Sequence, residues 1–377
     1  MKILFVSMPS LHFFRWAEQL KDAGHEVYWF DIVDGGQNVD RINWVNQIVG
    51  WKRRFNFPGR SFIKKKLTKL YKLVQKVNER NIANFFEEKL EEIQPDVVHS
   101  FALYVSCTPI LEVMQKYQST KWIYSSWGSD LFYFQNKPAF LRDIKRVLPR
   151  VNYLFTDCKR DFKLAEKYGF KGQFLGVFPG GGGFNLDQML IVRKPLDERK
   201  ILLIKGYEGR SGRAINVLKA IEYLEDLLGA YKIVVFGADK DVFKYIQDSE
   251  LNNWNNFEIV GKLSHEQVLQ LMGKSLCYIG NSNSDGLPNT LLEAICMGAF
   301  PIQSNPGGVT EEVIEVGING LIIQDCENIN EIGNVISSMV NNPVLLRKAF
   351  NYNAEIMQKW SDRVIKDKVL KIYSSLK

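Results

Sequence analysis

The strongest constraint on the fold is an alternation of short, β-rich runs with helical stretches, which both halves of the chain show. Strands joined through helices pair in parallel, because each connecting helix crosses back over the sheet. The expected strands are 2–6, 26–32, 96–100, 121–125 and 152–156 in the first half, and 200–204, 231–236, 257–260, 276–279 and 300–303 in the second. The sequence therefore predicts an α/β protein with two Rossmann-like parallel sheets.

A glycine run separates the two halves. Pro179 is followed by four glycines, Gly180 to Gly183, and such a run interrupts regular structure. At 377 residues the chain is long enough for two domains. We expect an N-terminal domain over 1–184, a C-terminal domain over 185–359 and a helical tail from about residue 360 to 377. Parallel sheets bind ligands beyond the carboxyl ends of their strands, so the two sheets are expected to face an interdomain cleft.

Composition favours a globular, cytoplasmic protein. Hydrophobic residues make up 46% of the chain and charged residues 24%. The apolar run at the start is too short for a signal peptide, and no stretch approaches the roughly 20 apolar residues that span a bilayer. The five cysteines are odd in number and form no Cys-x-x-Cys pair, which favours buried, reduced thiols.

The segment 280–294 combines two acids with a helix start. A polar loop follows a strand, and a helix begins near Thr290, with Asp285 in the loop and Glu293 in the first turns of the helix. A carboxylate can accept two hydroxyl hydrogen bonds, and a helix N-terminus offers free N–H groups to a phosphate. The pattern favours a ligand with hydroxyl and phosphate groups. The alternative is local: Thr290 with Glu293 matches a capping box, and Asp285-Gly286 is an ordinary turn.

A second glycine loop follows the next strand. Strand 300–303 leads into Gly307 and Gly308, and a helix is expected to begin there and to include Ile314. Paired glycines let the backbone approach a phosphate or sugar closely, and a second helix N-terminus would point into the same cleft. The alternative is a plain connection between a strand and a helix.

The stretch from Asp285 to Gly320 resembles the donor-site signature of the retaining glycosyltransferases of family 4, which have the GT-B fold. The matching elements are two acids separated by seven residues, a small-residue loop, Glu-Val-Ile and Asn-Gly-Leu, found here as Asp285 and Glu293, 306–308, 312–314 and 319–321. The resemblance implies that Asp285 contacts the transferred sugar and Glu293 the nucleotide ribose. Other expected donor-binding residues are Gly286, Leu287, Pro288, Asn289, Thr290, Gly307 and Gly308. Asp285 stands where the family normally has the longer Glu.

The family also places an Arg and a Lys on the donor diphosphate, just after the first strand of the second domain. Tyr207 and Gly212 occupy those positions here, so the match fails residue by residue. The segment 205–213 nevertheless contains three cations and three glycines. A diphosphate leaving group needs a cation near its oxygen, and the alternative is a solvated basic loop. The expected catalytic residues are Asp285, Lys205 and Arg213, with Arg213 the first choice among the cations, and Arg210 and Gly206 are expected to bind the donor.

In the first domain the segment 125–130 resembles the His-Gly-x-Asp element of the same family, with Trp127 in the histidine position. Asp130 would position the acceptor or cap the following turn. Two histidines near strand ends could also serve an acceptor, although a lone histidine often has a structural role. His12 lies in the first strand-to-helix loop with Arg15 behind it, and His99 ends a strand. The expected acceptor-binding residues are His12, Arg15, His99, Trp127 and Asp130.

No metal and no other cofactor is expected. Asp239-Lys240-Asp241 spells Asp-x-Asp, the metal clamp of another glycosyltransferase fold, but it follows a strand and opens a helix, where acids favour the helix dipole. GT-B enzymes generally need no bound metal. His25 and His265 are expected in surface turns, and no His/Cys cluster is evident.

The segment 52–80 is basic and amphipathic, with Glu79 as its single acid. Its apolar residues recur at roughly helical spacing: Phe62, Ile63, Leu67, Leu70, Tyr71, Val74 and Val77. Three interpretations compete: contact with an anionic membrane that carries a lipid-linked acceptor, binding of an acidic glycan, or a surface helix whose apolar face joins the core. Nucleic-acid binding is not expected, because the charge is local and no recognised module is present.

These features predict a retaining glycosyltransferase that moves a sugar from a nucleoside-diphosphate sugar to a glycan or lipid-linked acceptor, in cell-surface polysaccharide or glycoconjugate synthesis. The C-terminal helix is expected to pack back on the first domain, and the protein to work in the cytoplasm, with peripheral contact to the inner face of the membrane as an option. One alternative is a non-catalytic partner subunit with the same fold, which the substitutions at Asp285, Tyr207 and Trp127 suggest. Another is a sugar-nucleotide epimerase. A nicotinamide-dependent enzyme is disfavoured, because no Gly-x-Gly-x-x-Gly follows the first strand.

Overall fold

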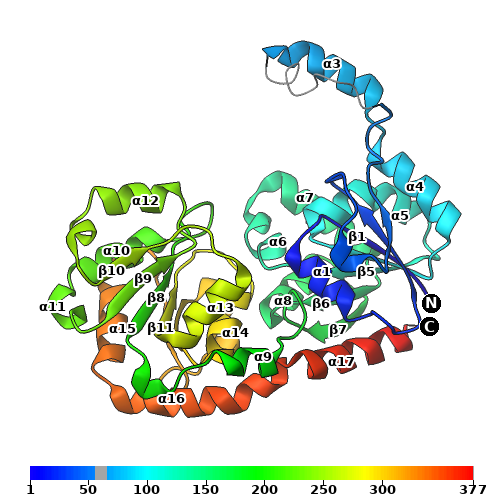
Figure 1. The fold of residues 1–377 in the computed structure, drawn as a ribbon. Coiled ribbons are helices and arrows are strands. Elements are labelled where there is room, and N and C mark those ends of the chain that lie inside the picture. The colour runs from blue at the N-terminus through cyan, green and yellow to red at the C-terminus, as the bar shows by residue number, and fades with distance from the viewer. Residues whose placement is uncertain (56–65, 377) are drawn as a thin grey trace. The chain divides into compact units, whose positions relative to one another are not determined.

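The computed structural model describes residues 1–55 and 66–376, which form two compact units (Figure 1). Unit 1 contains residues 1–156, 162–182 and the chain from Val369 onward, and unit 2 contains 157–161 and 183–368. The expected boundary after residue 184 and the observed one after Gly182 differ by two residues. The assignment of 157–161 to unit 2 has no counterpart in the sequence-based expectation.

Unit 1 is built on a seven-stranded parallel sheet with the order β3-β2-β1-β4-β5-β6-β7. Its strands are β1 (Lys2–Ser7), β2 (Glu26–Asp31), β3 (Asn46–Ile48), β4 (Val97–Phe101), β5 (Lys121–Ser125), β6 (Tyr153–Thr156) and β7 (Gln173–Val177). Its helices are α1 (Leu11–Glu18), α3 (Thr68–Asn78), α4 (Ile82–Ile93), α5 (Leu111–Lys116), α6 (Ser129–Phe132), α7 (Pro138–Val147) and most of α8 (Lys159–Lys167).

Both faces of the unit 1 sheet are covered. In β1, Leu4 and Val6 pack into a cluster with α4, α5 and α7, whereas Phe5 points the other way, towards Phe13 of α1 and Phe101 of β4. Burial on both faces is the reason that the central strands are continuous apolar runs, as expected for a parallel sheet.

Unit 2 is built on a six-stranded parallel sheet with the order β10-β9-β8-β11-β12-β13. Its strands are β8 (Ile201–Lys205), β9 (Lys232–Phe236), β10 (Phe257–Ile259), β11 (Ser275–Gly280), β12 (Phe300–Ser304) and β13 (Leu321–Ile323). Its helices are α9 (Leu186–Ile191), α10 (Ala214–Glu222), α11 (Glu225–Leu228), α12 (Lys240–Gln247), α13 (His265–Lys274), α14 (Asn289–Cys296), α15 (Ile329–Val340), α16 (Pro343–Ile356) and the start of α17 (Asp362–Ser375).

The second sheet also has two apolar faces. Leu202 and Ile204 of β8 pack with α10, α12, α15 and α16, and Leu203 packs on the opposite side with α9, α13 and α14. Two segments near the ends of unit 2 are hydrogen-bonded to each other. Phe184 N–H donates to the carbonyl of Trp360, and Asp362 N–H donates to the carbonyl of Phe184, both at 2.8 Å.

The structure corrects the expected helix at 307–314. Two 3-10 turns, Pro306–Gly308 and Thr310–Glu312, stand there instead. Gly307 and Gly308 have φ of +66° and +81°, outside the α-helical region, so no helix can start through them. α1 is short and ends at Glu18, and the segment 214–228 forms two helices, α10 and α11.

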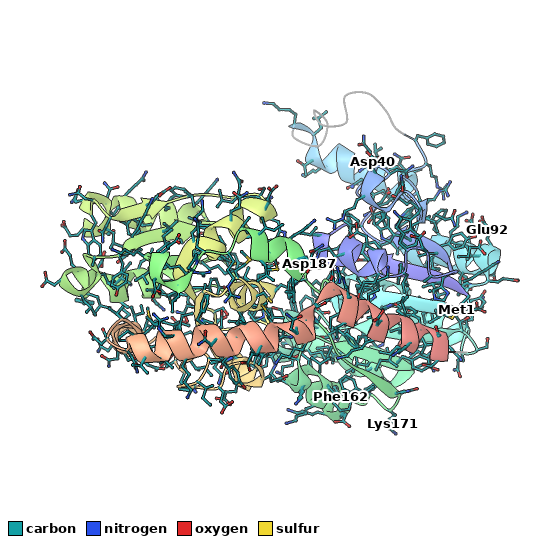
Figure 2. The ribbon with its side chains drawn as sticks, turned by 60° about the horizontal axis from the view of Figure 1, so that its bottom comes forward. Met1, Asp40, Glu92, Phe162, Lys171 and Asp187 are labelled. Carbon is teal, nitrogen blue, oxygen red and sulfur yellow. The ribbon has the colours of Figure 1, made fainter. Side chains whose placement is uncertain are left out.

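Charged side chains cover the outside of both units, and Asp40, Glu92 and Lys171 point outward in Figure 2. All five cysteines are free, and four of them are buried, as expected from their scattered positions. Of the helices in the described residues, none is long and apolar enough to span a bilayer.

Candidate functional site

Unit 2 brings a lysine and the start of a helix together at the carboxyl ends of two neighbouring strands. β8 and β11 pair in parallel with Ile204 opposite Ile279, so Lys205 and the loop after Gly280 leave the same edge of the sheet. The Lys205 ammonium lies 3.4 Å from Thr290 Oγ1, in the first turn of α14, and Tyr278 OH lies 3.1 Å from the same oxygen.

Asp285 and Glu293 both act on Lys205 electrostatically. Burial on its own would lower the pKa of Lys205, but the acidic groups of Tyr278, Asp285 and Glu293 raise it above its ordinary value. The lysine is therefore a fixed positive charge at neutral pH. Both carboxylates are therefore near enough to Lys205 to raise its pKa, and their role in donor binding stays a prediction.

Asp285 is half-buried in the loop after β11. Its Oδ1 accepts a hydrogen bond from Gly286 N–H at 2.9 Å. Burial raises the pKa of Asp285, and the nearby Lys205, Gly286 N–H and Arg160 only partly offset this effect. An ionised carboxylate at this place can accept hydrogen bonds from the hydroxyl groups of a ligand.

Glu293 is not part of a capping box. The N-cap of α14 is Pro288, and no side chain caps the helix. Glu293 is 4% exposed, and its Oε1 lies 2.7 Å from Nε2 of His265. His265 is the first residue of α13 rather than a turn residue, although its side chain is exposed as expected. The alternative prediction that Glu293 forms a capping box with Thr290 is therefore wrong. Its carboxylate contacts His265 instead.

The loop after β8 is held by carboxylates of the same unit. Asp239 Oδ2 accepts the N–H groups of Glu208 and Gly209 at 2.9 and 3.1 Å, and its Oδ1 accepts those of Asp241 and Val242, both at 3.2 Å. Burial raises the pKa of Asp239, but these four N–H groups outweigh it and lower the pKa below its ordinary value. Asp239 is a clamp between this loop and the start of α12.

The glycines of this loop serve packing. A Cβ on Gly206 would lie 2.8 Å from the Ala238 backbone, and one on Gly212 would lie 1.8 Å from the Tyr207 carbonyl. Gly212 forms an antiparallel bridge with Ser282, which ties this loop to the loop that carries Asp285. The close approaches explain the glycines without any phosphate contact, and they also bring the two loops together.

The three cations of the loop differ in their surroundings. The Arg213 guanidinium is paired with Glu327 and with the Gly212 carbonyl. Arg210 is exposed and lies close enough to lower the pKa of Asp285. Lys205, in contrast, points at α14. This geometry makes Lys205 a better candidate than Arg213 for the cation on the donor diphosphate, whereas the sequence favoured Arg213.

Several buried polar atoms beside this edge have no hydrogen-bond partner. They are Asn281 Oδ1, Asn283 Oδ1 and Ser284 Oγ in the loop after β11, and Gln303 Oε1 in β12. Buried polar groups are normally satisfied, so these atoms offer unused hydrogen-bonding capacity to a polar ligand. The expected site residues Leu287 and Pro288 are buried in the same loop, while Asn289 opens α14.

The described residues contain one group with metal-ligand character, Asp157, Cys158 and Asp161, whose ligand atoms lie within 4.8 Å of one another. Asp161 already forms an ion pair with Arg160 at 2.8 Å. The expected absence of a metal stays a prediction.

In unit 1 the structure separates the expected acceptor residues. His99 is fully buried: Nδ1 lies 2.5 Å from Tyr373 OH, Nε2 lies 2.7 Å from Ser125 Oγ, and its ring stacks on Phe101 at 4.2 Å. Burial lowers its pKa well below the ordinary value. The acceptor role predicted for His99 is therefore wrong, because both ring nitrogens are engaged inside the core.

Trp127 and His12 lie together. Their rings are 5.9 Å apart, and Trp127 also packs on Phe101 at 5.5 Å. His12 is exposed, but it is the second residue of α1 rather than a loop residue, and Arg15 follows it on the same helix.

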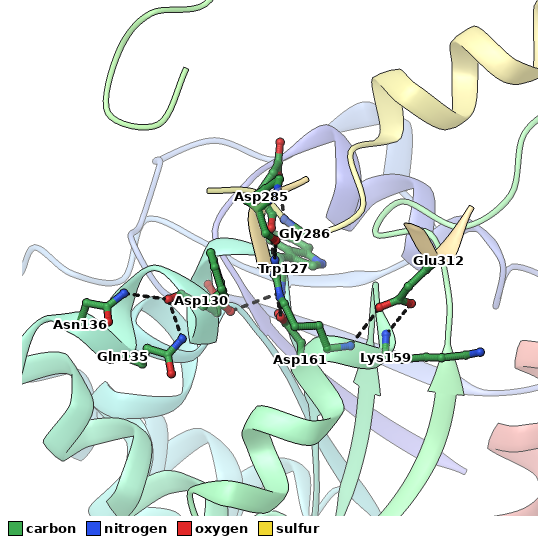
Figure 3. A network of polar contacts seen from close by, with 12 residues as sticks. Trp127, Asp130, Gln135, Asn136, Lys159, Asp161, Asp285, Gly286 and Glu312 are labelled. Carbon is green, nitrogen blue, oxygen red and sulfur yellow. Dashed lines mark hydrogen bonds and ion pairs between the residues drawn. The ribbon is translucent and has the colours of Figure 1, made fainter. Parts of the chain in front are cut away.

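Asp130 organises the loops after β4 and β5. Its Oδ2 accepts Leu103 N–H at 2.8 Å and Tyr124 OH at 3.1 Å. It also accepts Trp127 N–H at 3.4 Å (Figure 3). Asp130 is only 3% exposed, so it holds the backbone of Trp127 from the protein interior.

Residues 191–357 match the family model described as Glycosyl transferases group 1. The matched stretch, less than half of the chain, is similar to that family. It contains Lys205, Asp285, Glu293 and His265, so the whole candidate site except the short segment 157–161 belongs to it.

Two curated relatives from Methanocaldococcus jannaschii carry the name uncharacterized glycosyltransferase. MJ1069 is 31% identical over 144 residues, which is 37% of this chain and 36% of the relative. MJ1178 is 26% identical over 165 residues, 44% of this chain and 45% of the relative. The chain therefore matches less than half the length of each.

Solved structures match over the whole chain. A glycosyltransferase from Rickettsia africae has a TM-score of 0.67 at 16% identity and covers 100% of this chain and 98% of its own. Anabaena Alr3699/HepE with UDP and glucose has a TM-score of 0.68 at 14% identity over 100% of both chains. The lipopolysaccharide outer core galactosyltransferase WaaB has a TM-score of 0.67 at 15% identity, and the match covers 100% of this chain and 99% of WaaB. Together they show that the chain has the GT-B fold.

Proposed function

We propose that the protein is a retaining glycosyltransferase that moves a sugar from a nucleoside-diphosphate sugar to a glycan or lipid-linked acceptor. One observation carries the proposal: Lys205, at the carboxyl end of β8, contacts Thr290 in the first turn of α14, and the same loop-to-helix segment carries Asp285 and Glu293, within the residues that match the family model. Ligands of parallel α/β sheets bind at this end of the strands.

The three groups divide the donor between them. Glu293, buried and fixed by His265, accepts the ribose hydroxyls. Asp285 accepts hydroxyls of the transferred sugar. Lys205, with Arg210 nearby, stabilises the negative charge that develops on the diphosphate as the glycosidic bond breaks. The N–H groups at the start of α14 add to this stabilisation.

The first donor to test is UDP-glucose. Alr3699/HepE has been crystallised with UDP and with UDP-glucose, and its fold is the fold of this chain. We expect UDP and UDP-glucose to raise the melting temperature, because a ligand that binds only the folded state stabilises it. Absence of a shift with every nucleoside diphosphate and nucleotide sugar tested would argue against the proposal.

Turnover separates the remaining alternatives. Release of nucleoside diphosphate only after acceptor is added supports a transferase, and retention of the anomeric configuration in the product, read by NMR, supports the retaining mechanism. Conversion of the donor without acceptor supports an epimerase. Donor binding without turnover over a broad acceptor panel supports a non-catalytic partner subunit, which the departures at Asp285, Tyr207 and Trp127 favour.

We assign acceptor binding to unit 1. Trp127 offers a ring face to a sugar, and His12 lies against it. Arg15 is on the same helix, and Asp130 supports Trp127 through its backbone N–H. We expect Trp127→Ala to raise the acceptor KM while the donor KM changes little.

We also propose that α3 contacts an anionic membrane. Leu67 and Val77 are 48% and 75% exposed, and Phe55 is 73% exposed, so these residues do not join the core. Figure 1 shows α3 projecting from the rest of unit 1. Phe62 and Ile63, and the side chains of Leu70 and Tyr71, lie outside the described residues. Sedimentation with phosphatidylserine vesicles, compared with phosphatidylcholine vesicles, tests the contact.

A further inference from the structure

A buried arginine joins two loops of the candidate site. Arg160 lies in the segment 157–161, which belongs to unit 2 although the chain on both sides of it belongs to unit 1. Its side chain is only 9% exposed. An arginine this deeply buried needs partners for its N–H groups, and those partners indicate what it does.

The guanidinium reaches both loops through backbone carbonyls. Nη2 donates to the carbonyl of Asp285 at 2.8 Å, and Nη1 donates to the carbonyl of Pro306 at 2.6 Å. The first carbonyl belongs to the loop after β11, which carries the sugar-contacting acid. The second belongs to the loop after β12, which carries Gly307 and Gly308. One rigid, planar group therefore fixes the distance between these loops.

The loop after β12 holds the arginine segment in return. Glu312 accepts the backbone N–H groups of Lys159 and Arg160 at 2.8 and 3.0 Å, as Figure 3 shows for Lys159. Asp161 Oδ1 accepts from Nε at 3.0 Å and from Nη2 at 2.8 Å, which sets the plane of the guanidinium. The contact is reciprocal: a side chain from each segment binds the backbone of the other.

We propose that Arg160 is a positioning residue of the donor site, which holds the Asp285 loop and the 306–308 loop at the spacing that the donor requires. It acts through these loops and touches no substrate. The identity of the ligand rests on the proposed function. Productive geometry in such sites tolerates shifts of only about 0.5 Å, and the fork of an arginine can meet two carbonyls and a carboxylate at once, whereas a lysine cannot.

Three variants and a control test the proposal. Arg160→Lys keeps the charge and loses the fork. Arg160→Gln leaves the buried Asp161 unpaired, which can unfold the protein, so Arg160→Gln/Asp161→Asn removes both charges together. Arg347→Gln is the matched control in the same unit: Arg347 pairs with Asp197, and its side chain is 64% exposed.

Hydrogen–deuterium exchange of the ligand-free protein is the first measurement. We expect the backbone amides of 282–288 and 304–310 to exchange about tenfold faster in Arg160→Lys and in the double variant, while those of β8 and β9 and the control variant stay unchanged. Unchanged exchange in the two loops, or Arg160→Lys behaving as wild type, overturns the proposal. This measurement needs no ligand, so its outcome stands even if the wild-type protein binds no nucleotide sugar and the proposed function fails.

Kinetics with UDP-glucose are the second measurement. Because Glu293 and His265 are untouched, we expect the Kd for UDP to change less than about threefold and kcat to fall by at least about tenfold. Equal losses in UDP affinity and kcat, together with a lowered melting temperature, would indicate a merely structural residue and would overturn the positioning role.

Discussion

At the scale of single residues, the candidate site is defined by which side chains face one another across the edge of the unit 2 sheet. Glu293 is the best test, because it is buried and its partner is identified. Replacing it by Gln keeps its shape and removes its charge. A hydrogen bond to a charged group contributes about 1.5–3 kcal/mol, so we expect UDP to bind about 10- to 100-fold more weakly to Glu293→Gln. Isothermal titration calorimetry measures this directly.

Glu266→Gln is the control for that experiment, since Glu266 lies next to His265 on α13 and is exposed. It should leave UDP affinity unchanged. Wild-type affinity in Glu293→Gln would remove the ribose contact from the proposal.

Lys205 is expected to act on the chemical step. Lys205→Met keeps much of the side-chain volume and removes the ammonium group that contacts Thr290 of α14. Loss of one group that stabilises transition-state charge typically lowers kcat about 100- to 1000-fold. Lys262→Met, at an exposed position, is the control. Nucleoside diphosphate release under saturating donor measures the effect, and a variant that keeps full kcat would return the assignment to Arg210 or Arg213.

His99 makes the stability of unit 1 depend on pH. Its folded pKa is depressed well below 6.5, so between the two pKa values the unfolded chain binds a proton that the folded chain does not. Above pH 6.5 His99 therefore does not reduce the free energy of unfolding. As the pH falls below 6.5, this group lowers the free energy of unfolding by at most about 1.4 kcal/mol per pH unit. Denaturation curves between pH 8 and 5 measure the slope. The slope should become shallower in His99→Asn, and an identical slope in both proteins contradicts the assignment.

At the scale of elements, Asp239 is the most informative residue, because it joins the loop after β8 to α12. Asp239→Ala frees four N–H groups, and loss of an N-cap alone costs about 0.5–2 kcal/mol. We expect a lower melting temperature and weaker donor binding.

Asp241→Ala is the matched control for Asp239. A metal clamp would need both acids, whereas a capping role needs only Asp239. Equal damage from the two substitutions, reversed by added divalent cation, would falsify the capping account.

The central strands could be predicted from the sequence because they are apolar on both faces. The strands that escaped prediction, β3, β7 and β13, are edge strands. Asn46-Gln47-Ile48 is largely polar, and β7 is only half-buried, so neither is a continuous apolar run. The helix expected over 307–314 failed for a backbone reason, since the periodicity is present but Gly307 and Gly308 adopt positive φ.

The sequence identified the two acids of the candidate site, but it did not identify the residues that contact them. Asp285 and Glu293 lie in one loop-to-helix segment, where spacing along the chain carries the signal. His265 lies 28 residues from Glu293, and Arg160 lies 125 residues from Asp285, so only the tertiary fold brings these contacts about. The charged run 159–161, which begins three residues after the end of β6, was the available hint of Arg160.

At the scale of the whole molecule, unit 1 is completed by the end of the chain. Val369, Tyr373 and Leu376 are at most 4% exposed, and Trp16 Nε1–H donates to Tyr373 OH at 3.3 Å, on the same hydroxyl that contacts His99. Each fully buried side chain of this size stabilises by about 1.5–3 kcal/mol. Three of them together approach the total stability of an ordinary domain, about 5–15 kcal/mol.

Deleting the chain after Lys368 should therefore unfold unit 1 and leave unit 2 folded. Hydrogen exchange would become fast throughout 1–156, while amides of β8, β9 and β11 stay protected and UDP still raises the melting temperature of unit 2. Tyr373→Phe removes only the hydroxyl, and its loss of about 1–3 kcal/mol should be confined to unit 1. Tyr223→Phe, at a side chain that is 81% exposed, is the control. If the truncated protein kept slow exchange in β1 and β4, the last helix would be an attachment to unit 1 rather than part of its core.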